Sequence, residues 1–455
     1  MPKPSGINLI VNLSRHSPCL LGVALAIALV LPQTALASPA SQGFACANEY
    51  ITQADDWLSK LAEKYLGDAI VYPAITEATN QMHSVDPTFA EIVDPDRIAV
   101  GWKLCIPDTE TATALLDAKA GESAEGWVVE DALGRSVVFD TLPERVVSLG
   151  KGIFMMADAL YTFPEAGERV VALEGRNQSV SDFLPMVDPT FDRVEVLETD
   201  AGPEQVLPTN PDVIILKSYM AQRGELFEQV GIPVVYVDLE TPEQYFDDLT
   251  TLGQVFGNPA RAETIRSFYR AKVDAVSTSL LDLSTEQMPD VLVLQASDTG
   301  GSVAFKVPPA SWIQTTMVEM AGGNAVWKEA AQGGSWTVVN LEQIALWNPD
   351  KIFVVSYNSD PGRIVDDLMN DPSWQALDAA SNGELYGFAK DLYSWDQPDT
   401  RWILGLMWLA EKIHPEAFTA LDMEAEIYEF YGELYGMEAE AVDTHIFPIL
   451  QGDLE

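Results

Sequence analysis

Short apolar runs alternate with amphipathic stretches along most of the chain. Five of these runs have the length and β-branched content of buried strands: 212–218 (DVIILKS), 232–238 (IPVVYVD), 290–296 (DVLVLQA), 351–357 (KIFVVSY) and 384–389 (ELYGFA). The segments between them have helical periodicity. Apolar strands that alternate with helices predict parallel sheets covered by helices on both faces. Because the chain holds no continuous series of eight such units, a barrel is not predicted.

Two further patterns divide this region. Residues 127–139 alternate like a hairpin with Gly134 and Arg135 at its turn, and 144–163 follow as a strand, a glycine-containing turn and a helix. Residues 259–283 begin with a proline suited to a first helical turn and contain no glycine or second proline, which predicts one long helix. We therefore expect two Rossmann-like α/β lobes, 127–257 and 285–440, joined by a connecting helix over 258–284, with a cleft between them.

One motif occurs once in each lobe. GPEQVLPTNPDVIILK (202–217) and NLEQIALWNPDKIFVV (340–355) both place Asn-Pro-Asp six positions after a glutamate and follow it with a β-branched run. Asn-Pro stops a helix and turns the chain. Each copy therefore predicts a short helix, a turn and the start of a strand.

The N-terminus is typical of an export signal. Lys3 and Arg15 supply positive charge ahead of an apolar stretch over 19–31. Ala35-Leu36-Ala37 has the small-x-small form of a cleavage site. We expect a signal peptide over 1–37 and a location in the periplasm or at the cell surface; an uncut N-terminal anchor is the alternative. Two cysteines, Cys46 and Cys105, follow the signal. In an oxidising compartment they predict a disulfide, the alternative being two unpaired buried thiols.

The segment 44–108 is a small unit of its own. It has helical patterns over 57–65 and 72–78 between two strand-like runs, and the Ala/Thr/Glu/Asp-rich stretch 109–126 that follows is typical of a linker. It resembles a LysM domain at residues 55–58 (DDWL), at Asn80 and at 98–107 (IAVGWKLCIP). The resemblance implies a βααβ fold and an association with N-acetylglucosamine polymers such as peptidoglycan. A spacer or protein-contact module is the alternative.

Composition and charge exclude some classes of function. The 455 residues are 47% hydrophobic, and their net charge of −43 argues against a nucleic-acid partner, which requires cations for phosphate. No Gly-x-Ser-x-Gly or phosphate-binding loop is present, and no two histidines have metal-ligand spacing. We therefore expect neither an enzyme nor a cofactor. We expect the acidic segment 441–455 to be a tail outside the C-terminal lobe.

The large region, 128–438, resembles the substrate-binding proteins of ABC importers for iron chelates, haem or cobalamin. The resemblance is carried by LGRSVVFDTLPERVVSL (133–149), VEMAGGNAVW (318–327), GSWTVVNLEQIALWNPDKIFVV (334–355) and SWDQPDTRWILGLMWLAEKIHPE (394–416). It implies a protein that delivers its ligand to a dimeric permease, with Glu204 and Glu342 docking against permease arginines. Without the resemblance, each glutamate is explained by the start of a helix.

Ligand residues are expected just after the predicted strands. The candidates are Lys151, Tyr219, Arg223, Lys306, Trp336, Tyr357, Tyr393 and Trp395. Lysine and arginine suit the carboxylate or hydroxamate oxygens of a metal chelate, and aromatic rings suit a flat chelate or corrinoid. We expect Arg401 to be structural and paired with Asp396 or Asp399. A bare metal ion as ligand, and a glycan-binding protein or enzyme built on the LysM-like unit, are the competing interpretations.

Overall fold

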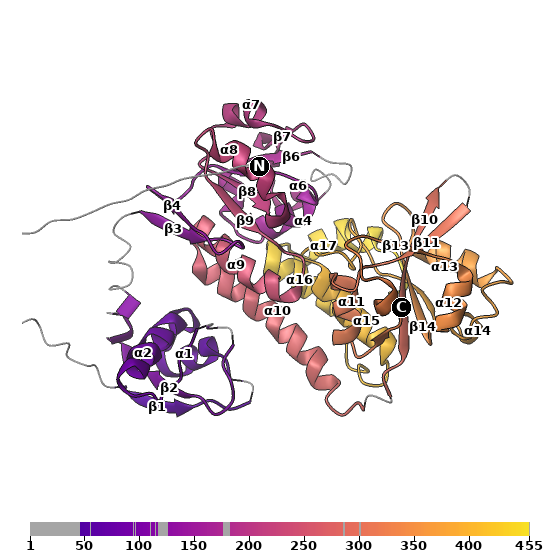
Figure 1. The fold of residues 1–455 in the computed structure, drawn as a ribbon, viewed down its shortest axis with the longest axis horizontal. Helices are drawn as coiled ribbons and strands as arrows, with labels where there is room; N and C mark the ends of the chain where they lie inside the picture. The colour runs from indigo at the N-terminus through magenta and orange to yellow at the C-terminus, as the bar shows by residue number, and fades with distance from the viewer. Residues whose placement is uncertain are drawn as a thin grey trace, which may run out of the picture. The chain divides into compact units, whose positions relative to one another are not determined.

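The computed structural model is drawn in Figure 1. It describes residues 46–54, 56–93, 95, 97–109, 111–113, 115–116, 126–175, 183–284, 287–299 and 302–454. The expected signal peptide over 1–37 lies outside these residues, as does Asp55 of the LysM-like motif. Among the residues described, no helix is both long and apolar enough to cross a bilayer.

The first unit has the element order strand, helix, helix, strand. β1 (Asn48–Ile51) pairs antiparallel with β2 (Lys103–Ile106), and α1 (Leu58–Leu66), the 3₁₀ turn η1 (Ala69–Val71) and α2 (Tyr72–Val85) lie between them in sequence. Asn80 on α2 exchanges two hydrogen bonds with the backbone of Ile92, of 2.9 and 2.7 Å, and so fixes the long loop before β2. The order is the one expected, while membership of the LysM family stays a prediction.

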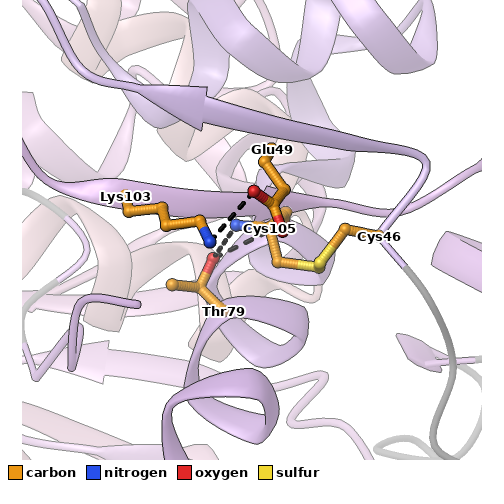
Figure 2. The surroundings of a disulfide bond; sticks show 5 residues. All are labelled: Cys46, Glu49, Thr79, Lys103 and Cys105. Atoms are coloured by element: carbon orange, nitrogen blue, oxygen red, sulfur yellow. Dashed lines mark hydrogen bonds and ion pairs between the residues drawn. A yellow bond between two sulfur atoms is a disulfide. The ribbon is translucent and has the colours of Figure 1, made fainter. Parts of the chain in front are cut away.

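A disulfide closes this unit, as expected from the cysteine count. Cys46 lies just before β1 and Cys105 lies in β2, with their Cα atoms 5.2 Å apart (Figure 2). Thr79 of α2 accepts the backbone N–H of Cys105 at 3.0 Å, and Lys103 forms an ion pair of 2.9 Å with Glu49. The bridge spans 59 residues and joins the ends of a small core. Restricting a loop of that length in the unfolded chain stabilises the unit by roughly 3–4 kcal/mol.

The N-terminal lobe is built on a parallel sheet. A hairpin of β3 (Trp127–Glu130) and β4 (Ser136–Phe139) comes first, with Gly134 at φ +70° in its turn, as predicted. The sheet order is β7-β6-β5-β8-β9, and all pairs are parallel. Its strands are β5 (Val146–Ser148), β6 (Val170–Glu174), β7 (Glu195–Leu197), β8 (Val213–Lys217) and β9 (Val234–Val237). Every residue of β8 and β9 is buried, which explains why these strands are apolar except for Lys217 at the end of β8.

Helices and 3₁₀ turns connect the strands of this lobe. They are α4 (Ile153–Leu160), α5 (Ala166–Arg169), α6 (Leu184–Val187), η2 (Phe191–Arg193), α7 (Pro203–Val206), η3 (Leu207–Thr209), η4 (Ser218–Met220), α8 (Ala221–Glu228) and α9 (Pro242–Phe256). The connecting helix follows as α10 (Pro259–Ser279), and the Asn258 side chain caps it by accepting the Arg261 N–H at 2.9 Å. Figure 1 shows α10 as one unbroken helix, as the sequence predicts.

The C-terminal lobe holds a mixed sheet in the order β13-β11-β10-β14-β15, with β12 also paired to β10. Its strands are β10 (Asp290–Thr299), β11 (Ser302–Val307), β12 (Asn324–Ala325), β13 (Thr337–Val339), β14 (Lys351–Val355) and β15 (Leu385–Gly387). The pairs β10–β14 and β14–β15 are parallel, as expected. β12 adds a short parallel pair with β10, and β11 and β13 are antiparallel additions. Neither β11 nor β13 was predicted as a strand: β11 contains Ser302 and Lys306, and β13 has only three residues.

The helices and 3₁₀ turns of the C-terminal lobe extend to the end of the chain. They are α11 (Ile313–Met320), η6 (Lys328–Ala330), α12 (Leu341–Trp347), α13 (Pro361–Met369), α14 (Asp378–Asn382), α15 (Trp402–Ile413), α16 (Met423–Tyr435), α17 (Ala439–His445) and η7 (Phe447–Ile449). The segment set apart as an acidic tail packs on this lobe. Asp453 accepts the indole N–H of Trp408 through its carbonyl at 2.7 Å and the Gly387 N–H through its carboxylate at 2.5 Å.

The repeated motif has the same backbone in both lobes. Asn210 and Asn348 end their helices in the left-handed conformation, with φ, ψ of 46°, 60° and 43°, 60°. The carboxylate of the aspartate two residues later then accepts a backbone N–H of the neighbouring central strand, at the start of that strand or just before it. The Asp212 carboxylate accepts the Arg145 N–H at 2.9 Å ahead of β5, and the Asp350 carboxylate accepts the Asp290 N–H at 2.8 Å in β10. Asn-Pro-Asp therefore positions a strand in each sheet.

A buried ionic cluster joins the two lobes. Arg401, at the start of α15, forms ion pairs of 2.6 Å with Asp158 of α4, 2.9 Å with Asp391 and 3.4 Å with Asp399, and all four side chains are fully buried. The expected partner Asp399 is therefore present, whereas Asp396 bonds elsewhere. Burial raises the pKa of Asp158 and of Asp399, and the attraction of Arg401 opposes both shifts. Because one guanidinium group faces three carboxyl groups, the cluster favours one proton shared among the carboxyl groups.

Loss of the inter-lobe partner should destabilise the whole protein. Asp158→Ala removes a buried charge-assisted hydrogen bond, so the free energy of unfolding in urea should fall by about 2–3 kcal/mol. Asp366→Ala, at an exposed position on α13, is the control and should change it by less than about 0.5 kcal/mol. Equal unfolding midpoints for the two variants would contradict a stabilising role for the cluster.

Candidate ligand cleft

A cavity of about 830 Å³ lies between the two lobes. The N-terminal lobe contributes residues that follow three of its strands: Lys151, Gly152 and Met155 after β5, Lys217 and Tyr219 at the end of β8, and Glu240, Thr241 and Gln244 after β9. The C-terminal lobe contributes Ser311, Trp312, Ile313, Gln314, Gly334, Trp336, Tyr357, Gln397 and Pro398. The cleft thus lies at the carboxyl ends of parallel strands, where open α/β sheets bind ligands.

The N-terminal side of the cleft is cationic. Lys217 is buried in the last position of β8, and its ammonium group pairs with the Glu240 carboxylate at 2.5 Å. Lys151 is exposed, and no carboxylate of the described residues forms an ion pair with it. Tyr219 donates a hydrogen bond of 3.3 Å to the carbonyl of Lys151. One ammonium group therefore remains available for an anionic ligand.

A strained turn brings Glu240 to the cleft. Leu239, just after β9, has φ +50°, a conformation that costs a leucine about 1 kcal/mol or more. The Asp248 carboxylate on α9 holds this turn by accepting the N–H groups of Asp238 and Leu239, both at 2.7 Å. Burial raises the pKa of Asp248 to about 7, although the two backbone hydrogen bonds favour its charged form.

The C-terminal side of the cleft is aromatic. The rings of Trp312 and Trp336 meet edge to face at 5.6 Å, and Trp336 meets Tyr357 in the same way at 6.3 Å. The Tyr357 hydroxyl donates to Asp396 at 3.0 Å, and burial is the main reason that the pKa of this hydroxyl is raised. Three rings fixed in this way form a wall against which a flat or partly apolar ligand can pack.

Half of the predicted ligand residues line the cleft, namely Lys151, Tyr219, Trp336 and Tyr357. The other four have different surroundings. Arg223 forms an ion pair of 2.6 Å with the buried Glu174, and Lys306 lies in β11 outside the lining residues. Tyr393 stacks on Phe154 at 4.4 Å, and the Trp395 indole donates to Asp391 at 3.0 Å, so both belong to the core where the lobes meet.

Several lining residues were not predicted. Lys217 and Glu240 end or follow predicted strands, so the rule that selected Lys151 could have found them. Gln244, Trp312 and Gln314 lie at the N-terminal ends of α9 and α11, where the sequence carries no sign of a ligand. Among the described residues, no group of three or more His, Cys, Asp or Glu side chains could hold a metal ion. The cleft therefore offers ammonium, carboxylate, amide, hydroxyl and aromatic groups.

Comparison with known proteins agrees with this architecture. The sequence model described as "Periplasmic binding protein" matches residues 164–392. The chain belongs to the periplasmic binding protein family. The molybdate-binding protein MolA of Haemophilus influenzae is 23% identical over 256 residues, which cover 51% of this chain and 69% of MolA.

Solved structures share the fold of this periplasmic binding protein. A periplasmic solute-binding protein of Veillonella parvula matches with a TM-score of 0.58 and 22% identity over 71% of this chain and 97% of its own. CeuE of Helicobacter pylori with nickel and histidine matches with a TM-score of 0.55 and 17% identity, over 70% of this chain and 99% of its own. MolA bound to molybdate matches with a TM-score of 0.55 and 18% identity, over 68% of this chain and 98% of its own. Membership of the periplasmic binding protein family makes the protein an extracytoplasmic solute-binding component of an ABC transporter. The relatives named here are binding proteins, not enzymes.

The buried Asp248 should make stability depend on pH. Its pKa is about 7 in the folded protein and near 3.8 when unfolded, so the folded state binds more protons between these values. The contribution of this group to the free energy of unfolding should therefore fall as pH rises from about 4 to about 7. Asp248→Asn keeps an acceptor oxygen but cannot titrate, so its stability relative to wild type should increase over that range in urea titrations. Asp247→Asn, at the exposed neighbouring position, should follow the wild-type profile, and identical profiles for all three proteins would contradict the assignment.

Proposed function

We propose that this periplasmic binding protein captures an anionic metal chelate, such as a ferric siderophore or haem, or a corrinoid, and delivers it to an ABC permease. The observation that carries the proposal is the division of the cleft: the available ammonium group of Lys151 on one side and a wall of three aromatic rings on the other. An ammonium group attracts carboxylate or hydroxamate oxygens, and the rings pack on the ligand framework.

The size of the cleft supports an organic ligand over a bare ion. Cavities of 300–1,000 Å³ are typical of sites for molecules of drug size, and this one is about 830 Å³. MolA, whose name gives molybdate as its ligand, suggests an oxyanion instead, and CeuE with nickel and histidine suggests a small metal complex. Neither ligand would use three aromatic rings. The lack of a metal-ligand group among the described residues also favours a metal that arrives already chelated.

Ligand binding can be measured by tryptophan fluorescence, since Trp312 and Trp336 line the cleft. We expect at least one of ferric hydroxamate, ferric catecholate, hemin and cyanocobalamin to bind with a dissociation constant below about 1 µM. Lys151→Gln and Trp336→Leu should each weaken that binding about tenfold, or about 1.4 kcal/mol. Lys328→Gln and Trp57→Leu, at positions that do not line the cleft, are the matched controls. Molybdate or nickel-histidine binding more tightly than every chelate would refute the proposal.

The repeated glutamates are the proposed contacts with the permease. Glu204 and Glu342 are exposed, and each lies in the first turn of the short helix that begins its copy of the motif. The shared Asn-Pro-Asp backbone presents the two carboxylates in similar local settings, one on each lobe. A dimeric permease would then meet one carboxylate with each subunit, and charge-assisted bonds to arginine give orientation and specificity.

Replacing both glutamates should separate docking from ligand binding. The double variant Glu204→Ala, Glu342→Ala should keep the wild-type ligand affinity, because neither residue lines the cleft, while transport by the reconstituted importer falls at least tenfold. Glu195→Ala with Glu329→Ala removes one carboxylate from each lobe at other positions and is the control. Equal transport by wild type and the first double variant would contradict the docking role. The start of a helix would then be the explanation of both glutamates.

The role of residues 44–108 rests on resemblance. Their strand-helix-helix-strand order and disulfide suit a LysM-like unit, and such a unit would hold the binding protein near peptidoglycan. Glycan binding by this segment stays a prediction.

A further inference from the structure

An ion pair on the N-terminal side of the cleft exposes only its negative member. Lys217 and Glu240 both line the cavity, and their ammonium and carboxylate groups are 2.5 Å apart. The lysine side chain is 1% exposed, whereas the glutamate side chain is 40% exposed. Protein atoms therefore cover the ammonium group, and Glu240 is the member of the pair that a ligand in the cavity can reach.

The backbone that carries this glutamate is fixed by several contacts. Glu240 follows Leu239, whose φ of +50° is strained for a leucine, and the Lys217 ammonium group donates to the Leu239 carbonyl at 3.4 Å. The Asp248 carboxylate accepts the Leu239 N–H at 2.7 Å. Strain of this kind persists only where neighbouring contacts maintain it, and it is concentrated at functional sites. The strained turn is therefore a second observation that indicates a binding role for Glu240.

Lys151 and Glu240 give the same wall of the cleft a positive and a negative group. Lys151 lies three residues after the end of β5, Glu240 lies three residues after the end of β9, and β8 lies between these strands in the sheet. Two strand spacings amount to roughly 10 Å. The two charged groups thus follow strands that are well separated, which suits an extended ligand better than a single small ion.

Resting on the proposed function, we propose that Glu240 determines specificity by binding a cationic donor group of the ligand, such as an ammonium group, while anionic oxygens of the same ligand face Lys151. A carboxylate only accepts hydrogen bonds, so it favours N–H donors and repels other anionic groups at that point. A hydroxamate siderophore with an amine arm meets both requirements. Hemin has only carboxylates at its polar edge and molybdate has only acceptor oxygens, so neither has a group for Glu240.

The test compares two forms of one chelate in titrations of the full-length protein by tryptophan fluorescence. Ferrioxamine B carries a terminal ammonium group. In its N-acetyl derivative this group is an uncharged amide, while the iron centre and the rest of the chelate are the same. Hemin, a ferric catecholate and cyanocobalamin complete the set of probes.

The variants separate a contact with the ligand from a structural role. Glu240→Gln removes the negative charge. The double variant Lys217→Met, Glu240→Gln also removes the buried ammonium group, which would otherwise lose its counter-charge. Glu243→Gln, at an exposed position nearby that does not line the cleft, is the matched control. Thermal melting checks the folding of each variant, and a general loss of affinity cancels from the ratio of the dissociation constants for the two forms.

We expect the wild type to bind ferrioxamine B about tenfold more tightly than the acetyl form, because acetylation removes a charge-assisted contact. This ratio should fall to within about twofold in both Glu240 variants and keep its wild-type value in Glu243→Gln. Equal binding of the two forms by wild type, or a ratio that persists in a folded Glu240 variant, overturns the inference and leaves the proposed function standing. Tighter binding of hemin, the catecholate or cyanocobalamin than of ferrioxamine B does the same. If no chelate binds, both fall. The comparison of the two forms in wild type does not depend on any variant folding.

Discussion

The ionic cluster around Arg401 determines how the two lobes meet. Removing charged groups from water is costly unless they are paired, and breaking a buried pair leaves a charge that nothing compensates. Arg401 of the C-terminal lobe and Asp158 of the N-terminal lobe share such a bond at 2.6 Å, with both side chains fully buried. Separating the lobes at this point would either expose the guanidinium group to water or leave it buried without its partner. Together with the single connecting helix α10, the cluster therefore favours a cleft that exists before the ligand arrives, which reduces the entropy lost on binding.

The chemistry of the cleft is arranged on this fixed frame by short-range contacts. Asp248 holds the strained turn at Leu239, the turn brings Glu240 to Lys217, and Asp238 at its start orients Gln244. On the other lobe Asp396 orients both Gln314 and Tyr357. Aspartates that do not line the cavity thus set the direction of groups that do. Fold alone does not dictate the ligand, since relatives that share it are named for molybdate or were solved with nickel and histidine.

Sequence patterns predicted the frame better than the site. The segments 212–218 and 351–357 could be assigned because strands buried on both faces are mostly apolar. β11 contains Ser302 and Lys306 and β13 has only three residues, and neither was predicted. The rule that ligand residues follow strands placed Lys151 and Tyr357 in the cleft. It failed for Trp395, because position along the chain does not give the direction of a side chain. Asp158 lies 243 residues from Arg401, a pairing for which one sequence holds no signal.

The C-terminal segment has a consequence for the edge of the C-terminal sheet. β15 ends the strand order of the C-terminal sheet, so one side of it would otherwise present unpaired backbone groups. Instead the Gly387 N–H is bonded to Asp453, and Gln451 forms a bridge with Lys390 just beyond the strand. An open sheet edge is a template for another chain, and covering it prevents edge-to-edge association. Residues 451–453 therefore cover part of this edge, and we expect a fusion tag placed there to compete with that protection.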